Sequence, residues 1–105
     1  YKQALQGIGD ISFQEVDADV NPNWWMPTIK TNKQAERLKK LNEEKLQSRP
    51  FWMPMNQLPM FIEDQYYHQN DCSDFIYRNC LSIPCSTYIS DMEMQKVVDV
   101  IKSVF

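Results

Sequence analysis

The chain has 105 residues, 43% of them hydrophobic and 24% charged, with a formal net charge of −3. Its length fits one ordinary domain without room for a second core, and its composition is that of a globular protein. No basic face suited to nucleic acid and no apolar run approaching the roughly 20 residues of a membrane span is present, so we expect neither as a partner.

The N-terminal third of the chain predicts one helical turn and two short strands. Residues 1–5 fit the last turn of a helix, because two glycines follow at once. Alternating apolar and polar residues over 11–16 predict a half-buried strand. Residues 24–30 predict a second extended segment. Pro27 should place this segment at a sheet edge or a bulge, since proline has no backbone donor.

A charged helix and a third strand are predicted next. Thr31 and Gln34 have the spacing of a capping box, which predicts a helix over 33–45. The narrow apolar stripe of this helix consists of Ala35, Leu38 and Leu41. Such a stripe among Lys and Glu is typical of a surface helix on one side of a sheet. Residues 46–53 predict the strand that follows.

Residues 49–61 form the most unusual stretch, with three prolines, two Phe, one Trp and three Met but no glycine. Prolines remove backbone donors and favour extended conformations in the residues before them. We therefore expect a short strand that leaves the sheet and then a fixed apolar loop over 51–61. Because so many apolar side chains are costly to expose, this loop should pack on another surface.

The C-terminal third predicts two more helices around a strand. Asp71 is placed to cap a short helix. The apolar face of that helix consists of Cys72, Phe75 and Ile76. Residues 80–84 predict a strand that ends at its proline. Ser90 and Glu93 form a second capping box, and the helix that they open has the clearest apolar pattern in the chain. That pattern consists of Met94, Val97, Val98, Ile101, Val104 and Phe105.

These elements together predict an α/β (α+β) fold, in which a small, mostly antiparallel sheet carries amphipathic helices packed on one face. The residue chemistry offers no self-contained catalytic or metal site. No glycine loop for phosphate is present, and His68 has no partner for nucleophilic work, so we interpret it as a partly exposed structural residue. The cysteines, Cys72, Cys80 and Cys85, are interpreted as buried, small apolar residues. Their odd number favours free thiols in a reducing compartment.

Arg49 stands apart from the other charged residues. It lies at a strand–loop junction beside Phe51 and Trp52, where a fixed guanidinium can bind a phosphate or carboxylate through two hydrogen bonds. Pairing with a carboxylate on the protein surface is an equally open alternative. On residue chemistry alone, the chain is an auxiliary domain that shapes a site or binds a partner.

Several motifs also follow one another in a recognisable order. They are Asn23-Trp24-Trp25, Ser48-Arg49-Pro50-Phe51-Trp52-Met53-Pro54-Met55, Leu58-Pro59-Met60-Phe61, Cys80-Leu81-Ser82-Ile83-Pro84-Cys85-Ser86, and a last helix opened by Ser90. Over nearly its whole length the chain resembles the C-terminal small domain of the DegT-type sugar-nucleotide aminotransferases, which are fold type I enzymes dependent on pyridoxal phosphate.

The resemblance implies that residues 1–105 are one domain of a longer, cytoplasmic, homodimeric enzyme whose large N-terminal domain is missing here. That enzyme would move an amino group from glutamate to a nucleotide-linked keto sugar in surface-polysaccharide or amino-sugar biosynthesis. Its pyridoxal phosphate would be held by the large domain. None of the eight lysines here lies in the sequence context of the Schiff-base lysine, so we expect this chain alone to bind no cofactor and to be inactive.

By the same resemblance, Arg49, Trp52 and Asn56 are expected near the substrate, in a domain that helps close the substrate side of the cleft. Family members frequently have His at the position of Asn56, and Asn keeps the hydrogen bond but not the charge change near neutral pH. Two alternatives stay open. One is a non-enzymatic protein-binding module that uses the apolar loop 51–61, and the other is a family member that has lost catalysis.

Overall fold

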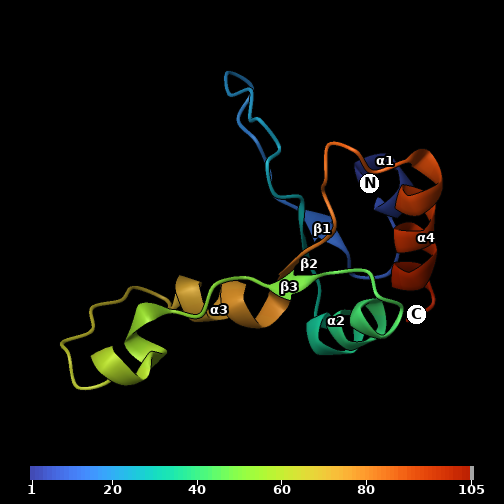
Figure 1. Ribbon diagram of the computed structural model, residues 1–105. Helices are drawn as coiled ribbons and strands as arrows, with labels where there is room; N and C mark the ends of the chain where they lie inside the picture. Colours follow the sequence, from blue (N-terminus) through green and yellow to red (C-terminus); the bar gives the residue numbers. More distant parts are fainter. Residues whose placement is uncertain (105) are drawn as a thin grey trace.

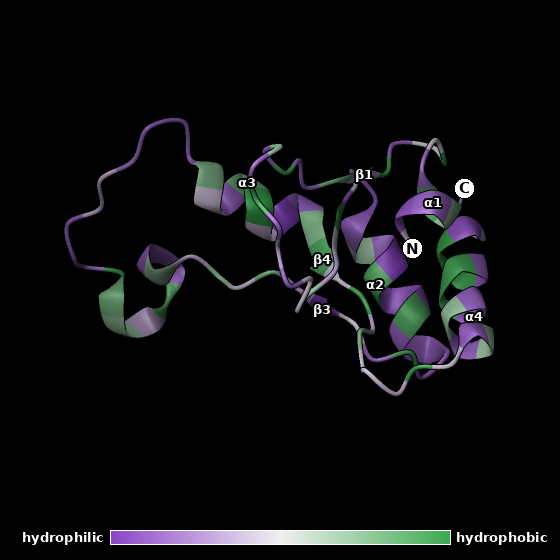
Figure 2. Ribbon diagram, turned by 90° about the horizontal axis from the view of Figure 1, so that it is seen from above, coloured by the Kyte–Doolittle hydropathy of each residue, from purple (hydrophilic) through white to green (hydrophobic). Residues whose placement is uncertain are grey.

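The computed structural model describes residues 1–104, and four short strands within them form one antiparallel sheet in the order β1-β2-β4-β3. The strands are β1 (Ser12–Phe13), β2 (Thr28–Lys30), β3 (Arg49–Pro50) and β4 (Cys80–Ser82). The helices are α1 (Lys2–Leu5), α2 (Gln34–Glu43), α3 (Cys72–Asn79) and α4 (Asp91–Lys102). Helices α1, α2 and α4 lie together on one side of the sheet, and α3 extends away from them (Figures 1 and 2). The predicted fold class is confirmed.

The register of the strands gives the sheet two different faces. Residues directly opposite one another in an antiparallel ladder share a face. Ile29 pairs with Leu81, and both are fully buried against the helices. The neighbouring pairs place Thr28 opposite Ser82 and Ser82 opposite Arg49. These three polar residues therefore form a row on the face that points away from the helices.

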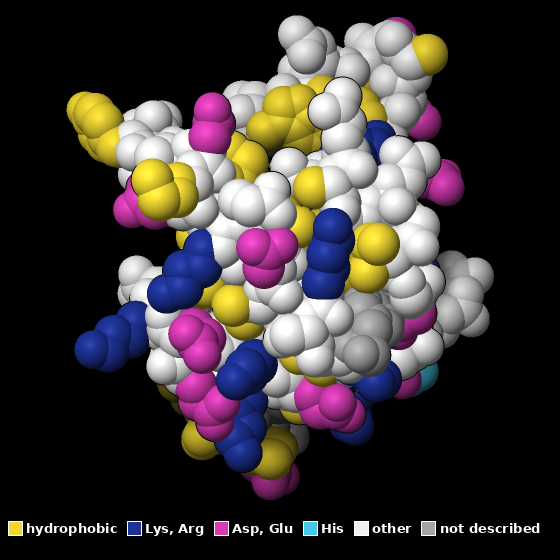
Figure 3. Space-filling view, turned by 90° about the vertical axis from the view of Figure 1, so that its right-hand side faces the viewer, with side chains coloured by type: hydrophobic (Ala, Val, Ile, Leu, Met, Phe, Trp, Pro, Cys, Tyr) yellow, Lys and Arg dark blue, Asp and Glu magenta, His cyan; other side chains and the backbone are white. Residues whose placement is uncertain are grey.

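Helix α4 supplies much of the core, as its sequence predicts. Val97, Val98 and Ile101 are buried, whereas Phe105 lies outside the described residues. The hydrophobic core consists of Leu5, Ile11, Ile29, Leu41, Leu81, Ile83, Val97, Val98 and Ile101. The outward side of this helical layer carries interspersed acidic and basic side chains (Figure 3). Among residues 1–104, no helix is long and apolar enough to cross a bilayer.

The predicted capping box at the start of α4 is confirmed. The Ser90 hydroxyl accepts a hydrogen bond from the Glu93 N–H at 3.3 Å, and the Glu93 carboxylate accepts one from the Ser90 N–H at 2.8 Å. We expect Ser90→Ala to lower the free energy of unfolding by about 1 kcal/mol, because the first turn loses its cap. Urea unfolding measures the change. Ser103→Ala, at the other end of α4, is the control and should change stability by less than about 0.5 kcal/mol.

The capping box predicted for α2 is wrong. Lys33 occupies the N-cap position of α2, and no side chain caps the helix. The Thr31 hydroxyl accepts from the Lys33 N–H at 3.1 Å and donates to the Asp10 carboxylate at 2.8 Å. The Gln34 amide instead donates to two carbonyl oxygens, those of Tyr77 at 2.8 Å and Cys80 at 3.0 Å. These long-range bonds tie α2 to α3 and β4.

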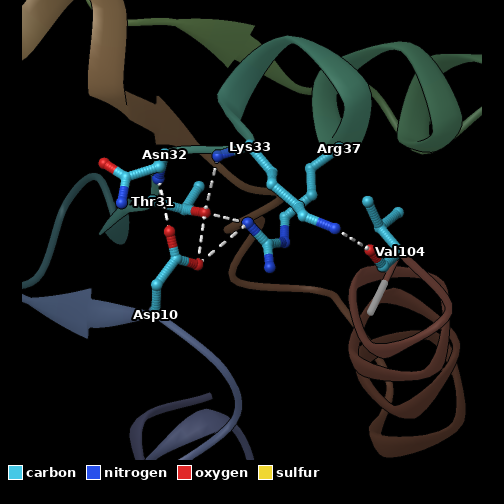
Figure 4. A network of polar contacts seen from close by, with 6 residues as sticks. All are labelled: Asp10, Thr31, Asn32, Lys33, Arg37 and Val104. Carbon is cyan, nitrogen blue, oxygen red and sulfur yellow. Dashed lines mark hydrogen bonds and ion pairs between the residues drawn. The ribbon is translucent and has the colours of Figure 1, made fainter.

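The buried face of α2 also differs from the predicted stripe. Arg37 is fully buried, and so is Leu41, whereas Ala35 is exposed. The Arg37 guanidinium donates to the Thr31 hydroxyl and lies 3.5 Å from the Asp10 carboxylate (Figure 4). Burial of this charged group is possible because it has partners in Asp10, just before β1, and Thr31, just after β2. The Lys33 ammonium extends the network to the Val104 carbonyl at 3.2 Å.

Asp10 makes the stability of the fold depend on pH. Burial alone would raise the pKa of Asp10, but bonds from the Asn32 N–H and the Thr31 hydroxyl, with the charge of Arg37, lower it below its ordinary value of 3.8. A carboxyl group whose pKa is lowered in the folded state stabilises the fold at pH values above its pKa in the unfolded chain. This contribution is lost as the pH falls through the pKa of the folded state.

We therefore expect Asp10→Asn to be less stable than the unaltered protein at about pH 7, and the difference to shrink below about pH 4. Urea midpoints at about pH 7 and about pH 3 test this expectation. Asp19→Asn, in the exposed loop after β1, is the matched control and should follow the unaltered protein at both values. A constant difference between Asp10→Asn and the unaltered protein would contradict the pH linkage.

Three predicted strands are shorter than expected or differently placed. The strand predicted over 11–16 covers only Ser12–Phe13, and the one predicted over 46–53 covers only Arg49–Pro50. Of the two predicted places for the segment with Pro27, an edge or a bulge, the edge is wrong, because strand β2 lies between β1 and β4. Pro27 comes directly before β2, where its carbonyl accepts the Ile83 N–H at 3.1 Å. Pro27 therefore lies outside the strand, where its lack of an N–H group removes no hydrogen bond from the ladder.

Candidate functional site

Residues 51–71, which we call the arm, leave the sheet after β3 and return to it through α3. The arm projects well away from α2 and α4 (Figure 1). It contains two 3₁₀ turns, Met55–Gln57 and Pro59–Phe61, as expected of a fixed loop rich in proline. Gln57 fastens the arm to α3 by donating to the Asp74 carboxylate at 2.6 Å. The arm is therefore positioned by α3 and not by the hydrophobic core.

The end of the arm is fixed by a small polar cluster. The Tyr66 hydroxyl donates to the Asp71 carboxylate at 3.0 Å, and the Tyr66 ring stacks on His68 with centroids 5.2 Å apart. Asp71 occupies the N-cap position of α3, but its side chain does not cap that helix as predicted. Its backbone is left-handed, with φ of 48°, and its carboxylate instead accepts the hydrogen bond from Tyr66. The position of His68, exposed and stacked, fits the structural interpretation.

The first candidate site is an open hollow of about 730 Å³, which we call the sheet hollow. It is lined by Met26, Gln47, Arg49, Pro50, Phe51, Trp52, Met53, Tyr77, Ser82, Ile83, Pro84, Cys85 and Ser86. The cross-strand pairing of Arg49 with Ser82 places both residues on the sheet face away from the helices. The hollow therefore lies where the sheet is not covered by the helical layer.

Arg49 and Trp52, two of the predicted site residues, line the sheet hollow together. Arg49 is exposed, and its guanidinium forms no hydrogen bond or ion pair with any residue in the range 1–104. Trp52 is 66% exposed, and Phe51 holds its ring edge-on with centroids 5.1 Å apart. The alternative that Arg49 pairs with a carboxylate finds no partner among the described residues. The hollow presents a free guanidinium beside an exposed indole ring.

Asn56, the third predicted site residue, lies in a different place. It lines a second hollow of about 480 Å³ formed by residues of the arm and Ser73 of α3, which we call the arm hollow. This hollow is lined by Pro54, Met55, Asn56, Phe61, Asp64, Gln65, Tyr66 and Ser73. The Oδ1 atom of Asn56 is buried and accepts no hydrogen bond from the part of the chain that the structure describes. The structure thus divides the three residues between two hollows.

The interpretation of all three cysteines as buried is wrong. Only Cys80 is buried, and burial raises the pKa of its thiol. Cys72 lies on the exposed side of α3, and Cys85 is exposed in the lining of the sheet hollow. The Cys85 thiol donates to the Trp25 carbonyl at 3.2 Å. Within residues 1–104 no group of cysteine, histidine or acidic side chains is arranged to hold a metal ion.

Sequence reasoning did not identify two residues that shape the sheet hollow. Ser82 becomes a neighbour of Arg49 only through the strand register, which the sequence does not specify. Tyr1 lies outside the lining, yet its hydroxyl donates to the Pro84 carbonyl at 2.9 Å and so anchors the wall of the hollow. Burial, helped by the nearby Cys85, raises the pKa of Tyr1 to about 12. A tyrosine before a helical turn gives no sequence signal for this contact.

Several solved structures share this fold, and some of them are named as aminotransferases. DesV from S. venezuelae matches 98% of the chain with a TM-score of 0.85 at 17% identity, and the chain covers 28% of DesV. The sugar aminotransferase CalS13 from Micromonospora echinospora matches all of the chain with a TM-score of 0.85 at 18% identity, and the chain again covers 28% of it.

Sequence comparison identifies the family. The chain is 24% identical over 112 residues to EpsN of Bacillus subtilis (strain 168), a protein named as a pyridoxal phosphate-dependent aminotransferase, and spans 29% of its length. The sequence model of the DegT/DnrJ/EryC1/StrS aminotransferase family matches residues 1–102. The chain therefore belongs to the DegT/DnrJ/EryC1/StrS aminotransferase family.

Proposed function

We propose that residues 1–105 are the C-terminal small domain of a pyridoxal phosphate-dependent aminotransferase. The enzyme transfers the amino group of glutamate to the keto carbon of a nucleotide-linked sugar, for surface-polysaccharide or amino-sugar biosynthesis. It works in the cytoplasm as a homodimer, and this domain closes the substrate side of the cleft. The family membership and the share of the relatives' length that the chain covers, 28–29%, support this proposal.

The residues of the sheet hollow do not supply the groups that hold pyridoxal phosphate. Enzymes of this kind use a lysine for the Schiff base and an acidic or Arg partner for the pyridine nitrogen. Arg49 lines the sheet hollow, but no lysine does, so the group that would form the Schiff base is absent from this lining. We propose that the large domain binds the cofactor, which carries the amino group between the two substrates, and that this chain contributes to substrate binding only.

The observation that carries the proposal is the unpaired Arg49 on the open face of the sheet. A guanidinium fits the oxygens of a phosphate through two parallel hydrogen bonds, which are about twice as strong as neutral ones. Trp52, beside it, offers a large apolar surface for the sugar, and its rigid ring loses little conformational entropy on binding. Arg49 and Trp52 therefore bind and orient the nucleotide-linked sugar, and the arm excludes water from it.

An isotope-transfer assay with the full-length protein tests the proposed function. The protein is incubated with nitrogen-labelled glutamate and nucleotide-linked 4-keto or 3-keto sugars. Transfer replaces the keto oxygen of the sugar by the labelled amino group and converts glutamate to 2-oxoglutarate. Mass spectrometry of the sugar should therefore show the label. A protein that produces neither product from any of these sugars would contradict the proposal.

The second candidate function, a non-enzymatic protein-binding module, is favoured by one observation. Three apolar side chains of the loop 51–61, Trp52, Met55 and Met60, are each more than 60% exposed. Exposed apolar patches frequently mark protein-binding surfaces. In this case the full-length protein would bind no cofactor and transfer no label, and substitution of Met60 by Asp would abolish binding to its partner. The same assay thus separates the two candidates.

A further inference from the structure

We propose that the arm hollow binds the nucleobase of the nucleotide-linked substrate and that Asn56 recognises the hydrogen-bonding edge of the base. This inference rests on the proposed function, which supplies the nucleotide. It adds a second subsite, separate from the one at Arg49, and assigns to each hollow a different part of one ligand.

The buried amide of Asn56 is the first reason for this assignment. Its Oδ1 atom accepts no hydrogen bond from any described residue. A buried acceptor without a donor costs about 1–3 kcal/mol, so such atoms are rare unless something else binds there. A carboxamide also presents a donor next to its acceptor, and this pair matches the adjacent N–H and C=O groups on the edge of a base.

The walls of the arm hollow suit a flat ring. Pro54, Phe61 and Tyr66 supply apolar and aromatic surface, and the volume of about 480 Å³ lies within the range of small-molecule sites. Tyr66 is already held in place by its hydroxyl bond to Asp71 and by stacking on His68. A base that stacks on a fixed aromatic ring gains about 1–3 kcal/mol. The hollow is thus organised before the ligand arrives.

The charges of the two hollows decide which part of the nucleotide each one takes. The sheet hollow is lined by Arg49 and by no carboxylate. The arm hollow is lined by Asp64 and by no Lys or Arg. Negative phosphates are therefore favoured beside Arg49 and disfavoured beside Asp64, whereas a neutral base is accepted there. Residues 49–53, from β3 and the start of the arm, line the first hollow and residues 54–56 the second, so consecutive residues of the chain serve consecutive parts of the ligand.

Titration calorimetry of the full-length holoenzyme tests the assignment. The probes are uridine, thymidine and guanosine diphosphates, with inorganic pyrophosphate as the reference without a base. We expect at least one nucleoside diphosphate to bind about tenfold or more tightly than pyrophosphate. Asn56→Ala should reduce this preference by about tenfold and leave pyrophosphate binding unchanged. Arg49→Ala should weaken the binding of both classes of probe.

Three results would overturn the assignment. The first is that no nucleoside diphosphate binds more tightly than pyrophosphate, or that none of the probes binds. The second is that Asn56→Ala keeps the preference for a nucleoside diphosphate, as expected if a water or a protein donor satisfies the amide, and the third is that Asn56→Ala weakens pyrophosphate and nucleoside diphosphates equally. Asn56→Asp, which keeps the size of the side chain but loses the donor, replaces Asn56→Ala if that variant fails to fold. Gln95→Ala, an amide on the exposed face of α4, is the matched control.

Failure of the proposed function is a separate result. It would appear as a full-length protein that transfers no amino group from glutamate, an assay that involves no Asn56 variant. If nucleoside diphosphates still bound more tightly than pyrophosphate, and this preference depended on Asn56, the arm hollow would remain the nucleobase site in that case. An active aminotransferase without such a preference would remove the nucleobase subsite and leave the proposed function in place.

Discussion

Arg49→Ala in the full-length protein is expected to lower kcat/KM for the nucleotide-linked sugar by about 10- to 100-fold, mainly through KM. The loss corresponds to one charge-assisted interaction with phosphate, which is worth about 1.5–3 kcal/mol. The reaction with glutamate should be unchanged, because glutamate has no phosphate. Steady-state kinetics with each substrate varied in turn measure both effects.

Two further variants make this prediction specific. Arg49→Lys keeps the charge but loses the planar fork, so it should recover only part of the activity. Arg78→Ala removes an arginine whose side chain is 70% exposed on α3, where it pairs with Asp74, and should change kcat/KM by less than about twofold. If Arg49→Ala weakened the reactions of glutamate and sugar equally, or neither of them, Arg49 would not be a phosphate-binding residue.

Arg37→Ala is expected to lower the free energy of unfolding by about 3–5 kcal/mol, which is a large loss for a single substitution. Arg37 is fully buried, and its removal leaves a cavity and deprives the Thr31 hydroxyl and the Asp10 carboxylate of a donor. Urea unfolding of the protein measures the loss.

The same exposed arginine serves as the control for stability. Arg78→Ala should cost no more than about 1 kcal/mol, because an exposed ion pair contributes little. The double variant Asp10→Ala, Arg37→Met should recover part of the loss, since an apolar side chain then replaces the arginine and no carboxylate is left without its partner. A cost for Arg37→Ala similar to that of Arg78→Ala would show that the buried network does not hold α2 in place.

Local patterns predicted those parts of the fold that depend on neighbouring residues. The capping box of Ser90 and Glu93 is complete within α4 itself and is confirmed, and so is the burial of Val97, Val98 and Ile101 from the predicted stripe. The strand predicted over 80–84 is present as β4, although it covers only Cys80–Ser82 and ends before the proline. The sheet with helices on one face follows from these elements, since each apolar stripe needs a surface to cover.

The mistaken predictions for α2 share a physical cause, which is that distant residues compete for the same groups. Thr31 and Gln34 have the capping spacing, but their side chains form other hydrogen bonds. Thr31 donates to Asp10, and Gln34 donates to the carbonyls of Tyr77 and Cys80. Arg37 was missed for the same reason, although its place three residues after Gln34 and four before Leu41 puts it on their face of the helix. The candidate site depends on strand register and on the course of the arm, and neither is encoded in a local pattern.

The most direct test of the central claim is the absorbance spectrum of the full-length protein, purified with its cofactor, before and after the addition of glutamate. We expect an absorption band of enzyme-bound pyridoxal phosphate that changes when glutamate is added and returns when a nucleotide-linked keto sugar follows. In the Arg49→Ala variant the first change should be retained and the return slowed. A full-length protein without such a band, or with a band that glutamate does not change, would contradict the assignment of this chain to a working aminotransferase.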